Sequence, residues 1–258
     1  MFKTIIDQSN DNITIYNYLL KIRLGQSKIN HFLYNDNIKV NNKIINDKDY
    51  ILKKKDKLLI DTSYYDDIKV KPIYYNLDIL YEDEYILAVR KPRGLIIYSL
   101  DDKDLSLDNY VAGYYEINNI DSCVRHIHRL DKETTGVILY AKDVITHGAL
   151  SSLFEDRKII KKYLTVVKGK ISKDGVIDLP IGKDRHHKNK MVISKNSGLE
   201  SITHYHILGS NNNYTFLECI IETGRTHQIR VQFASRKHPL VGDGKYGNNY
   251  ASSYNDYI

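Results

Sequence analysis

Apolar residues recur at helical spacing near the start of the chain and at alternating spacing further along. Two short helices are expected first: one over residues 15–22, and a second with Ser27 as N-cap and Ile29, Phe32 and Leu33 on one face. Short apolar strands should follow at 38–40, 43–45 and 57–60, the first two joined by an Asn-Asn turn pair. The pattern predicts a small unit of two helices and then strands.

A second, larger region follows a segment of mixed polarity that contains a proline. We expect a small domain over 1–61, a linker over 62–76 and a second domain over 77–258. In the second domain, apolar segments around an acidic turn at 82–84 predict a hairpin. Further strands are expected at 137–141, 163–167, 201–208 and 214–223, and helices at 107–115, 146–156 and 226–236. Many strands with few intervening helices indicate an α+β domain on a mostly antiparallel, mixed sheet.

Composition places the chain among soluble globular proteins. Hydrophobic residues make up 42% and charged residues 27% of its 258 residues, with no apolar run long enough to span a bilayer. The N-terminus lacks an apolar signal core, so we expect a cytoplasmic protein without membrane contact. Cys123 and Cys219 lie in apolar stretches, which favours reduced, buried thiols over a disulfide. The net charge of +6 is a mild bias toward polyanions.

The strongest chemical signal is the run HRLDKETTGVILYAK over 128–142. It places Asp131 between Arg129 and Lys132, ahead of a turn into an apolar strand. Nearby positive charge favours the ionised carboxylate and holds it in one orientation. Taken alone, the same pattern also fits an aspartate that only caps a turn.

Five motifs in a fixed order favour a catalytic role for Asp131 over a role as a turn cap. Besides the Asp131 run, they are RKPRGLIIY at 90–98, KKYLTVVKG at 161–169, ETGRTHQIRVQFA at 222–234 and HPLVGDGKYG at 238–247. This set resembles the RluA/RluD-type pseudouridine synthases and covers most of the chain. The resemblance implies an RNA-modifying isomerase that converts uridine to pseudouridine without a cofactor. Gln232 departs from the family, which commonly has histidine there.

The resemblance also implies residue roles. Asp131 matches the catalytic aspartate, Tyr163 the tyrosine beside the target base, and Arg225 the arginine paired with the aspartate. Breaking the glycosidic bond at C1′ requires a carboxylate close to the sugar in a dry pocket. Arg129 is the position that can fill the space left by a flipped base, or else it forms a supporting ion pair. We expect Lys91 and Arg230 to contact RNA phosphates.

The first region has a resemblance of its own. SKINHFLYNDNIKVNNKII and the later KKKDKLLI are similar to the small RNA-binding domain first known from ribosomal small-subunit protein four. Asn37 and Asn42 stand where that family usually has glycine, and its basic residues are sparser here. Asparagine tolerates the left-handed conformation, so the hairpin is expected to survive. The alternative is a small scaffold with a solvated lysine run.

Partner and competing predictions follow from the same motifs. We expect a monomer that acts on structured RNA, ribosomal RNA more than transfer RNA, with no metal. Cys123, His126 and His128 are spaced loosely like metal ligands, but no second ligand pair follows them. Two alternatives remain: a catalytically idle RNA-binding protein in ribosome assembly, and a metal-dependent nuclease that would need carboxylates clustered with the histidines.

Overall fold

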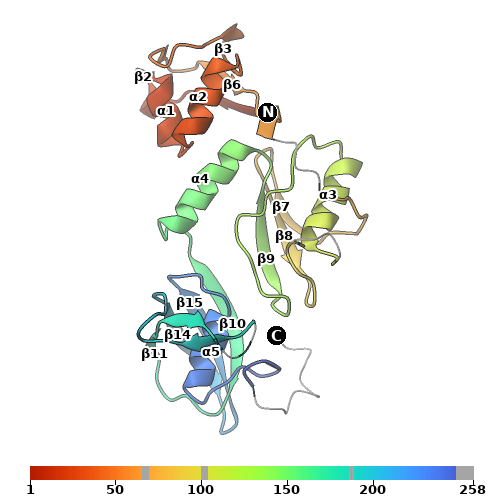
Figure 1. Ribbon diagram of the computed structural model, residues 1–258, viewed down its shortest axis with the longest axis vertical. Helices are drawn as coiled ribbons and strands as arrows, with labels where there is room; N and C mark the ends of the chain where they lie inside the picture. Colours follow the sequence, from red (N-terminus) through yellow and green to blue (C-terminus); the bar gives the residue numbers. More distant parts are fainter. Residues whose placement is uncertain (66–69, 100–103, 186, 188, 248–258) are drawn as a thin grey trace. The chain divides into compact units, whose positions relative to one another are not determined.

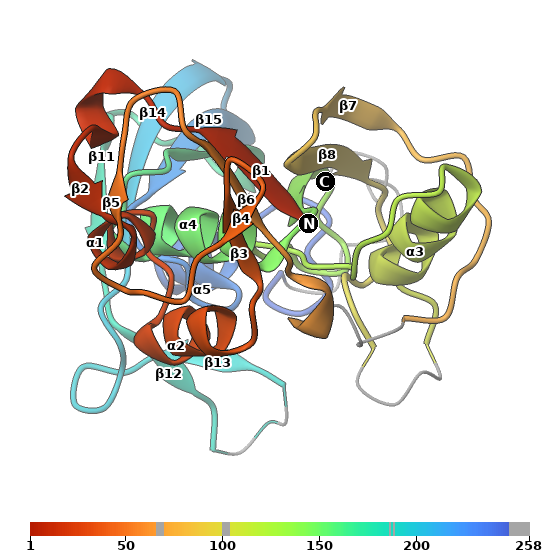
Figure 2. The same ribbon diagram turned by 90° about the horizontal axis from the view of Figure 1, so that it is seen from above.

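The chain is described here by a computed structural model, which covers residues 1–65, 70–99, 104–185, 187 and 189–247 (Figures 1 and 2). Its contacts separate two compact units, Met1–Asp156 and Arg157–Ile258. Each unit has its own sheets and hydrophobic core.

The N-terminal part of the first unit is a small α/β assembly. Its elements are β1 (Phe2–Ile5), η1 (Gln8–Asn10), β2 (Ile13–Thr14), α1 (Ile15–Lys21), α2 (Gln26–Tyr34), β3 (Ile38–Val40), β4 (Lys43–Ile44), β5 (Ile51–Leu52), β6 (Lys57–Ile60) and η2 (Ser63–Tyr65). An antiparallel sheet of order β1-β6-β3-β4 forms, with a short β2-β5 pair beside it. Ile15, Ile29 and Phe32, all fully buried, bring both helices into one core with the sheet.

Local signals explain these elements. Thr14 caps α1, because its Oγ1 accepts the amide of Asn17 at 3.2 Å. The predicted cap of α2 was wrong: the helix begins at Gln26, and Gly25 is the N-cap. Asn41 and Asn42 have φ values of 49° and 68°, as a tight hairpin between β3 and β4 requires.

The rest of the first unit is a sheet covered by a helix. Its elements are β7 (Ile79–Glu82), β8 (Ile86–Lys91), α3 (Leu107–Ile117), β9 (Gly136–Ala141) and α4 (Val144–Glu155). The predicted hairpin is confirmed as the antiparallel β7-β8 pair, and β9 joins β8 on its other side. Figure 1 shows α3 beside this sheet, and Val111 and Tyr115 on α3 share a buried cluster with Leu87 and Ile138.

Helix α4 connects the two parts of the first unit. Asp143 caps it by accepting the amides of Ile145 and Thr146 at 2.8 Å each. Val144 and Ile145 belong to the hydrophobic core of the N-terminal part, and Arg23 pairs with Asp156 at 2.9 Å. The first turn of α4 is therefore part of the N-terminal core, although it lies more than eighty residues away in sequence.

In its described residues, the second unit has a four-stranded antiparallel sheet, a two-stranded sheet and one helix. Its elements are β10 (Lys161–Lys168), β11 (Gly175–Asp178), β12 (Ile181–Lys183), β13 (Met191–Ile193), β14 (Ile202–Ser210), β15 (Tyr214–Ile221) and α5 (Gln228–Ser235). The sheet order is β10-β15-β14-β11, and all its pairs are antiparallel. Phe233 of α5 packs edge-on against Tyr205, with ring centroids 5.4 Å apart. The predicted α+β class is confirmed.

Gln232, the departure from the family pattern, is fully buried beside that contact. Its side-chain oxygen accepts the Thr203 hydroxyl at 2.7 Å, and its amide donates to the carbonyl of Ser201 at 2.6 Å. The buried glutamine is thus paired on both ends and ties α5 to the start of β14.

Candidate active site

Asp131 lies in a loop that leads into β9. The Thr134 amide donates to the Asp131 carbonyl at 3.0 Å, which closes a turn directly after the aspartate. Gly136 then starts β9 with a φ of 141°, a conformation that strongly favours glycine. The Gly94 amide donates to the Lys132 carbonyl at 2.9 Å, so the loop is also attached to the segment after β8. The half-buried carboxylate therefore stands on a backbone fixed at several points.

Lys91 is the main internal support of this loop. Its side chain is 0% exposed, and Nζ donates to the carbonyl oxygens of Pro92 at 2.8 Å, Leu95 at 2.8 Å and Lys132 at 2.9 Å. Burial lowers the pKa of this ammonium to about 8, although the carboxylates of Glu133 and Asp131 oppose the shift. All three ammonium donors are used inside the protein. The expected contact of Lys91 with an RNA phosphate therefore does not fit the structure, because the side chain is buried and bonded inside the protein.

Arg129 is held at the surface by an aromatic and acidic network. Its guanidinium donates to the Tyr98 hydroxyl at 3.0 Å and lies 5.9 Å from the centre of that ring. Tyr98 stacks on His126 with centroids 5.2 Å apart, and His126 Nδ1 lies 3.1 Å from Asp108. The buried Tyr140 hydroxyl donates to the same carboxylate at 2.9 Å. The guanidinium of Arg129 is thus an exposed cation that is anchored to Tyr98, two residues before Asp131.

Tyr163 lies in the second unit, on β10. It is paired with Cys219 of β15 in the antiparallel register and packs against the buried cluster of that unit. Its side chain is half-buried, so part of the ring is supported by the core and part is accessible. This is the placement that a ring needs if it is to present one surface to a ligand.

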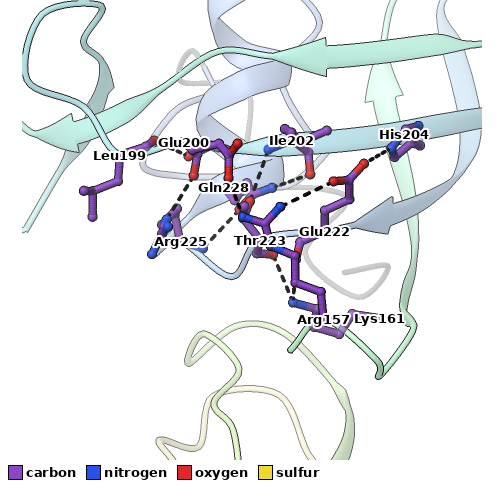
Figure 3. Close-up of polar contacts among 11 residues, drawn as sticks. Arg157, Lys161, Leu199, Glu200, Ile202, His204, Glu222, Thr223, Arg225 and Gln228 are labelled. Atoms are coloured by element: carbon purple, nitrogen blue, oxygen red, sulfur yellow. Dashed lines mark hydrogen bonds and ion pairs between the residues drawn. The ribbon is translucent and has the colours of Figure 1, made fainter. Parts of the chain in front are cut away.

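Arg225 occupies the turn between β15 and α5 (Figure 3). Its Nε donates to the Glu200 carbonyl at 3.0 Å, and its amide donates to the side-chain oxygen of Gln228 at 3.0 Å. The same oxygen accepts the Thr223 hydroxyl at 2.8 Å. The side chain of the buried Gln228 therefore fixes the conformation of this turn. Among the groups drawn in Figure 3, the Arg225 guanidinium bonds through its Nε to the Glu200 carbonyl.

Two further cationic side chains, those of Lys161 and Arg157, lie next to this turn. Lys161 donates to the carbonyl oxygens of Glu222 at 3.4 Å and Thr223 at 3.2 Å. Its pKa is lowered, first by burial and then by the charges of Arg157 and Arg225. Arg157 pairs with Glu200 and lies 3.7 Å from the Glu222 carboxylate. Three cations and two carboxylates thus meet at the turn that carries Arg225. Sequence reasoning missed Lys161, although it stands two residues before Tyr163.

Arg230 has an internal partner. Its Nε and Nη2 donate to the two oxygens of Asp243, at 2.8 and 2.9 Å. Burial alone would raise the pKa of Asp243, but Arg230 and the amides of Lys245 and Tyr246 lower it overall. The Arg230 side chain is only 18% exposed. The pair ties α5 to the loop at 242–246 and does not present Arg230 as a surface cation.

The six predicted site residues fall into two sets. Lys91, Arg129 and Asp131 belong to the first unit, and the structure brings Lys91 and Asp131 into one local assembly. The second unit contains the other set, Tyr163, Arg225 and Arg230. Asp131 and Arg225 belong to different units, and their pairing stays a prediction.

The histidines considered as metal ligands have other contacts. His128 accepts the Leu139 amide at 3.3 Å and stacks on Phe154, with ring centroids 5.1 Å apart. Cys123 is a buried thiol. Within the part of the chain that the structure describes, no group of three or more His, Cys, Asp or Glu side chains is arranged to hold a metal ion.

Comparison with known families decides the classification. The model of the family described as RNA pseudouridylate synthase matches residues 85–235, which include Lys91, Asp131, Tyr163 and Arg225. The chain belongs to this family. It is an RNA pseudouridine synthase, an isomerase whose substrate is RNA, and the RluA/RluD-type resemblance is confirmed.

Individual relatives give the same result. The chain is 37% identical over 250 residues to an uncharacterized RNA pseudouridine synthase of Bacillus subtilis, covering 94% of this chain and 82% of that protein. A ribosomal large subunit pseudouridine synthase D of Neisseria meningitidis is 37% identical over 174 residues, covering 67% of this chain and 46% of the relative. The solved human RNA pseudouridylate synthase domain containing 1 has a TM-score of 0.58 at 26% identity, covering 68% of this chain and 71% of that one.

One negative finding concerns membranes. Among the helices that the structure describes, none combines the length and the apolar character needed to cross a bilayer.

Proposed function

We propose that this enzyme converts specific uridines of ribosomal RNA to pseudouridine, with Asp131 as the catalytic carboxylate. The N1–C1′ bond of the uridine breaks, the uracil turns over, C5 bonds to C1′, the C5 proton leaves, and N1 gains a proton. Asp131 can act by attack at C1′, by addition to the base, or by taking a sugar proton in an elimination. The overall change is an isomerisation in every case, so no atom is gained or lost.

The observation that carries this proposal is the construction of the Asp131 loop. Lys91 is a buried lysine whose ammonium donates to three carbonyl oxygens. Lysines are seldom fully buried, and a loop that only caps a turn does not need such a support. Holding the backbone on both sides of a carboxylate is what preorganised chemistry at one sugar carbon requires. The alternative of Asp131 as a simple turn cap does not account for that support.

Tyr163 and Arg225 are proposed as the partners of Asp131. The half-buried ring of Tyr163 would stack on the uracil, and its hydroxyl oxygen would accept the C5 proton. Arg225 would pair with the Asp131 carboxylate and hold it in one orientation. Arg129 would enter the space that the flipped uridine leaves in a stem. For Lys91 and Arg230 we now propose internal roles, as supports of the Asp131 loop and of the 242–246 loop.

The substrate class and setting rest on relatives. Several relatives at 35 to 37% identity are named ribosomal large subunit pseudouridine synthase D, which favours ribosomal RNA over transfer RNA for this chain. We propose that the enzyme acts as a monomer in the cytoplasm. We also propose that residues 1–61 form an RNA-binding domain joined through 62–76 to the catalytic domain at 77–258.

The test is to map pseudouridines in RNA from cells with and without the gene. Loss of one or a few sites confined to ribosomal RNA would support the proposal. Loss confined to transfer RNA would overturn the proposed target, and an unchanged map would overturn the proposed activity in the cell. Re-expression of the Asp131→Asn variant supplies the control, because it should restore none of the lost sites.

A further inference from the structure

Three aromatic rings form a cluster where the N-terminal part of the first unit meets the following segment. His31 of α2 and Tyr64 of η2 have ring centroids 4.1 Å apart with an interplanar angle of 34°. Tyr65 contacts both rings edge-on, at 5.4 Å from His31 and 5.1 Å from Tyr64. The buried Phe32 supports Tyr65 from beneath at 5.5 Å. This aromatic cluster is therefore anchored in the core.

Tyr64 remains 63% exposed despite these contacts. One side of its ring is fixed by His31 and Tyr65, so it does not need to be ordered when a ligand arrives. A ring with a fixed position and an accessible surface loses little entropy on stacking. The aromatic cluster thus offers a preorganised stacking platform.

Cations from two separate segments lie beside the platform. Lys28 of α2 places Nζ 5.6 Å from the centre of the Tyr65 ring. Arg125, in the loop before β9, donates to the Tyr65 carbonyl at 2.6 Å.

These charges are close enough to shift the pKa of Lys28 and of His147 on α4. The pKa of Lys28 is lowered, first by burial and then by the charge of Arg125. The pKa of His147 is also lowered, by burial and then by Arg125 and Lys28. Like charges held together in this way favour an incoming anion.

We propose that this surface, made by Tyr64, His31, Lys28 and Arg125, binds an unpaired nucleotide of the substrate RNA. The base would stack on the exposed side of Tyr64, and its phosphate would lie near Lys28 and Arg125. An aromatic ring flanked by cations is the combination that single-stranded nucleic acid needs, because every base has a flat surface and every nucleotide a negative charge.

The inference rests on the proposed function only in taking RNA as the ligand. Its new content is that RNA recognition is not confined to residues 1–61. It includes Tyr64 and Tyr65 in the proposed linker and Arg125 in the catalytic part of the chain. None of these residues belongs to the proposed set of Asp131, Tyr163 and Arg225, so the surface would place the RNA without taking part in the chemistry.

The test is a binding titration by fluorescence anisotropy with two labelled RNAs. One is a hairpin with a large unpaired adenosine loop, and the other is a fully paired duplex with the same stem sequence. Tyr64→Ala should weaken binding of the hairpin by about 5- to 150-fold and leave the duplex unchanged. Tyr64→Trp should retain hairpin affinity, which shows that any loss is not due to misfolding.

Two further variants sharpen the reading. Tyr34→Ala is the matched control, because Tyr34 lies at the end of α2 and is 83% exposed. It should leave both affinities unchanged. Lys28→Gln should reduce the slope of log affinity against log salt for the hairpin by about 0.7. Unchanged hairpin binding by Tyr64→Ala, or an equal loss on hairpin and duplex, would overturn the proposal.

Failure of this proposal and failure of the proposed function give different results. Binding is measured without turnover, whereas isomerisation is followed separately as tritium release from RNA labelled at C5 of uridine. Turnover by the wild type together with an inert Tyr64→Ala substitution would refute the surface alone. A selective Tyr64 effect on the hairpin, with no turnover on any uridine RNA, would support the surface and refute the activity.

Discussion

Replacement of Lys91 by methionine tests the internal support of the Asp131 loop. Methionine has a similar length and fills the same buried space, but it cannot donate to the carbonyl oxygens of Pro92, Leu95 and Lys132. The Lys132 carbonyl keeps the Gly94 amide as a donor, and the loss of the ammonium costs each of the other two carbonyls about 1–3 kcal/mol. Relief of the cost of burying a charge offsets part of this loss. We expect the free energy of unfolding to fall by about 2–4 kcal/mol.

The pH dependence of the stability difference between the wild type and Lys91→Met is a second, independent test. The pKa of Lys91 is lowered from 10.5 to about 8 in the folded protein, so between these values the unfolded chain binds more protons. The wild type should therefore gain stability relative to Lys91→Met as the pH rises from about 8 toward 10.5. Below about pH 8, Lys91 is protonated in both the folded and the unfolded chain, so the difference in unfolding free energy between the two proteins should not change with pH through this group.

Urea denaturation across this pH range and turnover at a fixed pH measure both effects. Lys132→Gln is the control, because Lys132 is an exposed lysine of the same loop, and its substitution should change stability by less than about 0.5 kcal/mol. Displacement of the loop should lower kcat of Lys91→Met by about 100-fold. Stability and kcat equal to those of Lys132→Gln would refute the role assigned to the buried ammonium.

Substitutions at three further residues test the other proposed roles. Tyr163→Phe should keep RNA affinity but lower kcat, because it retains the ring and loses the hydroxyl, whereas Tyr163→Leu should lose both; wild-type rates for both variants would leave the tyrosine as core packing only. Arg230→Gln leaves the Asp243 charge buried without its partner, so unfolding free energy should fall by about 3 kcal/mol with hairpin affinity unchanged; a selective loss of RNA affinity would restore Arg230 as a phosphate contact. Arg129→Ala should slow turnover of a uridine in a stem more than of a uridine in a loop; equal effects on both would argue against a role in base flipping.

The sequence predicted the elements whose apolar pattern is long and regular. The hairpin of β7 and β8, strand β9 and the β14-β15 pair were all expected, because alternation over several residues reflects one buried face. Strand β1 and the short strands β11, β12 and β13 were missed. Strands of three or four residues offer too few positions for a period to emerge, and their pairing depends on distant segments.

The candidate site shows a similar limit. Motif order pointed to Asp131, Tyr163 and Arg225, since these carry recognisable chemistry. It misjudged the setting of Lys91 and Arg230, because a cation looks the same in sequence whether it faces solvent or a buried carbonyl. The roles differ only through contacts with Lys132 and Asp243, which lie 41 and 13 residues away. Lys161 was passed over for the same reason.

The most direct test of the central claim is turnover by the Asp131→Asn variant on RNA labelled with tritium at C5 of uridine. The substitution preserves the shape of the side chain and removes its charge. We predict tritium release by the wild type, none above background by the variant, and affinities for the same RNA that agree within about twofold, since Asp131 is assigned to chemistry and not to binding. Tritium release by Asp131→Asn at a rate close to that of the wild type would contradict the account.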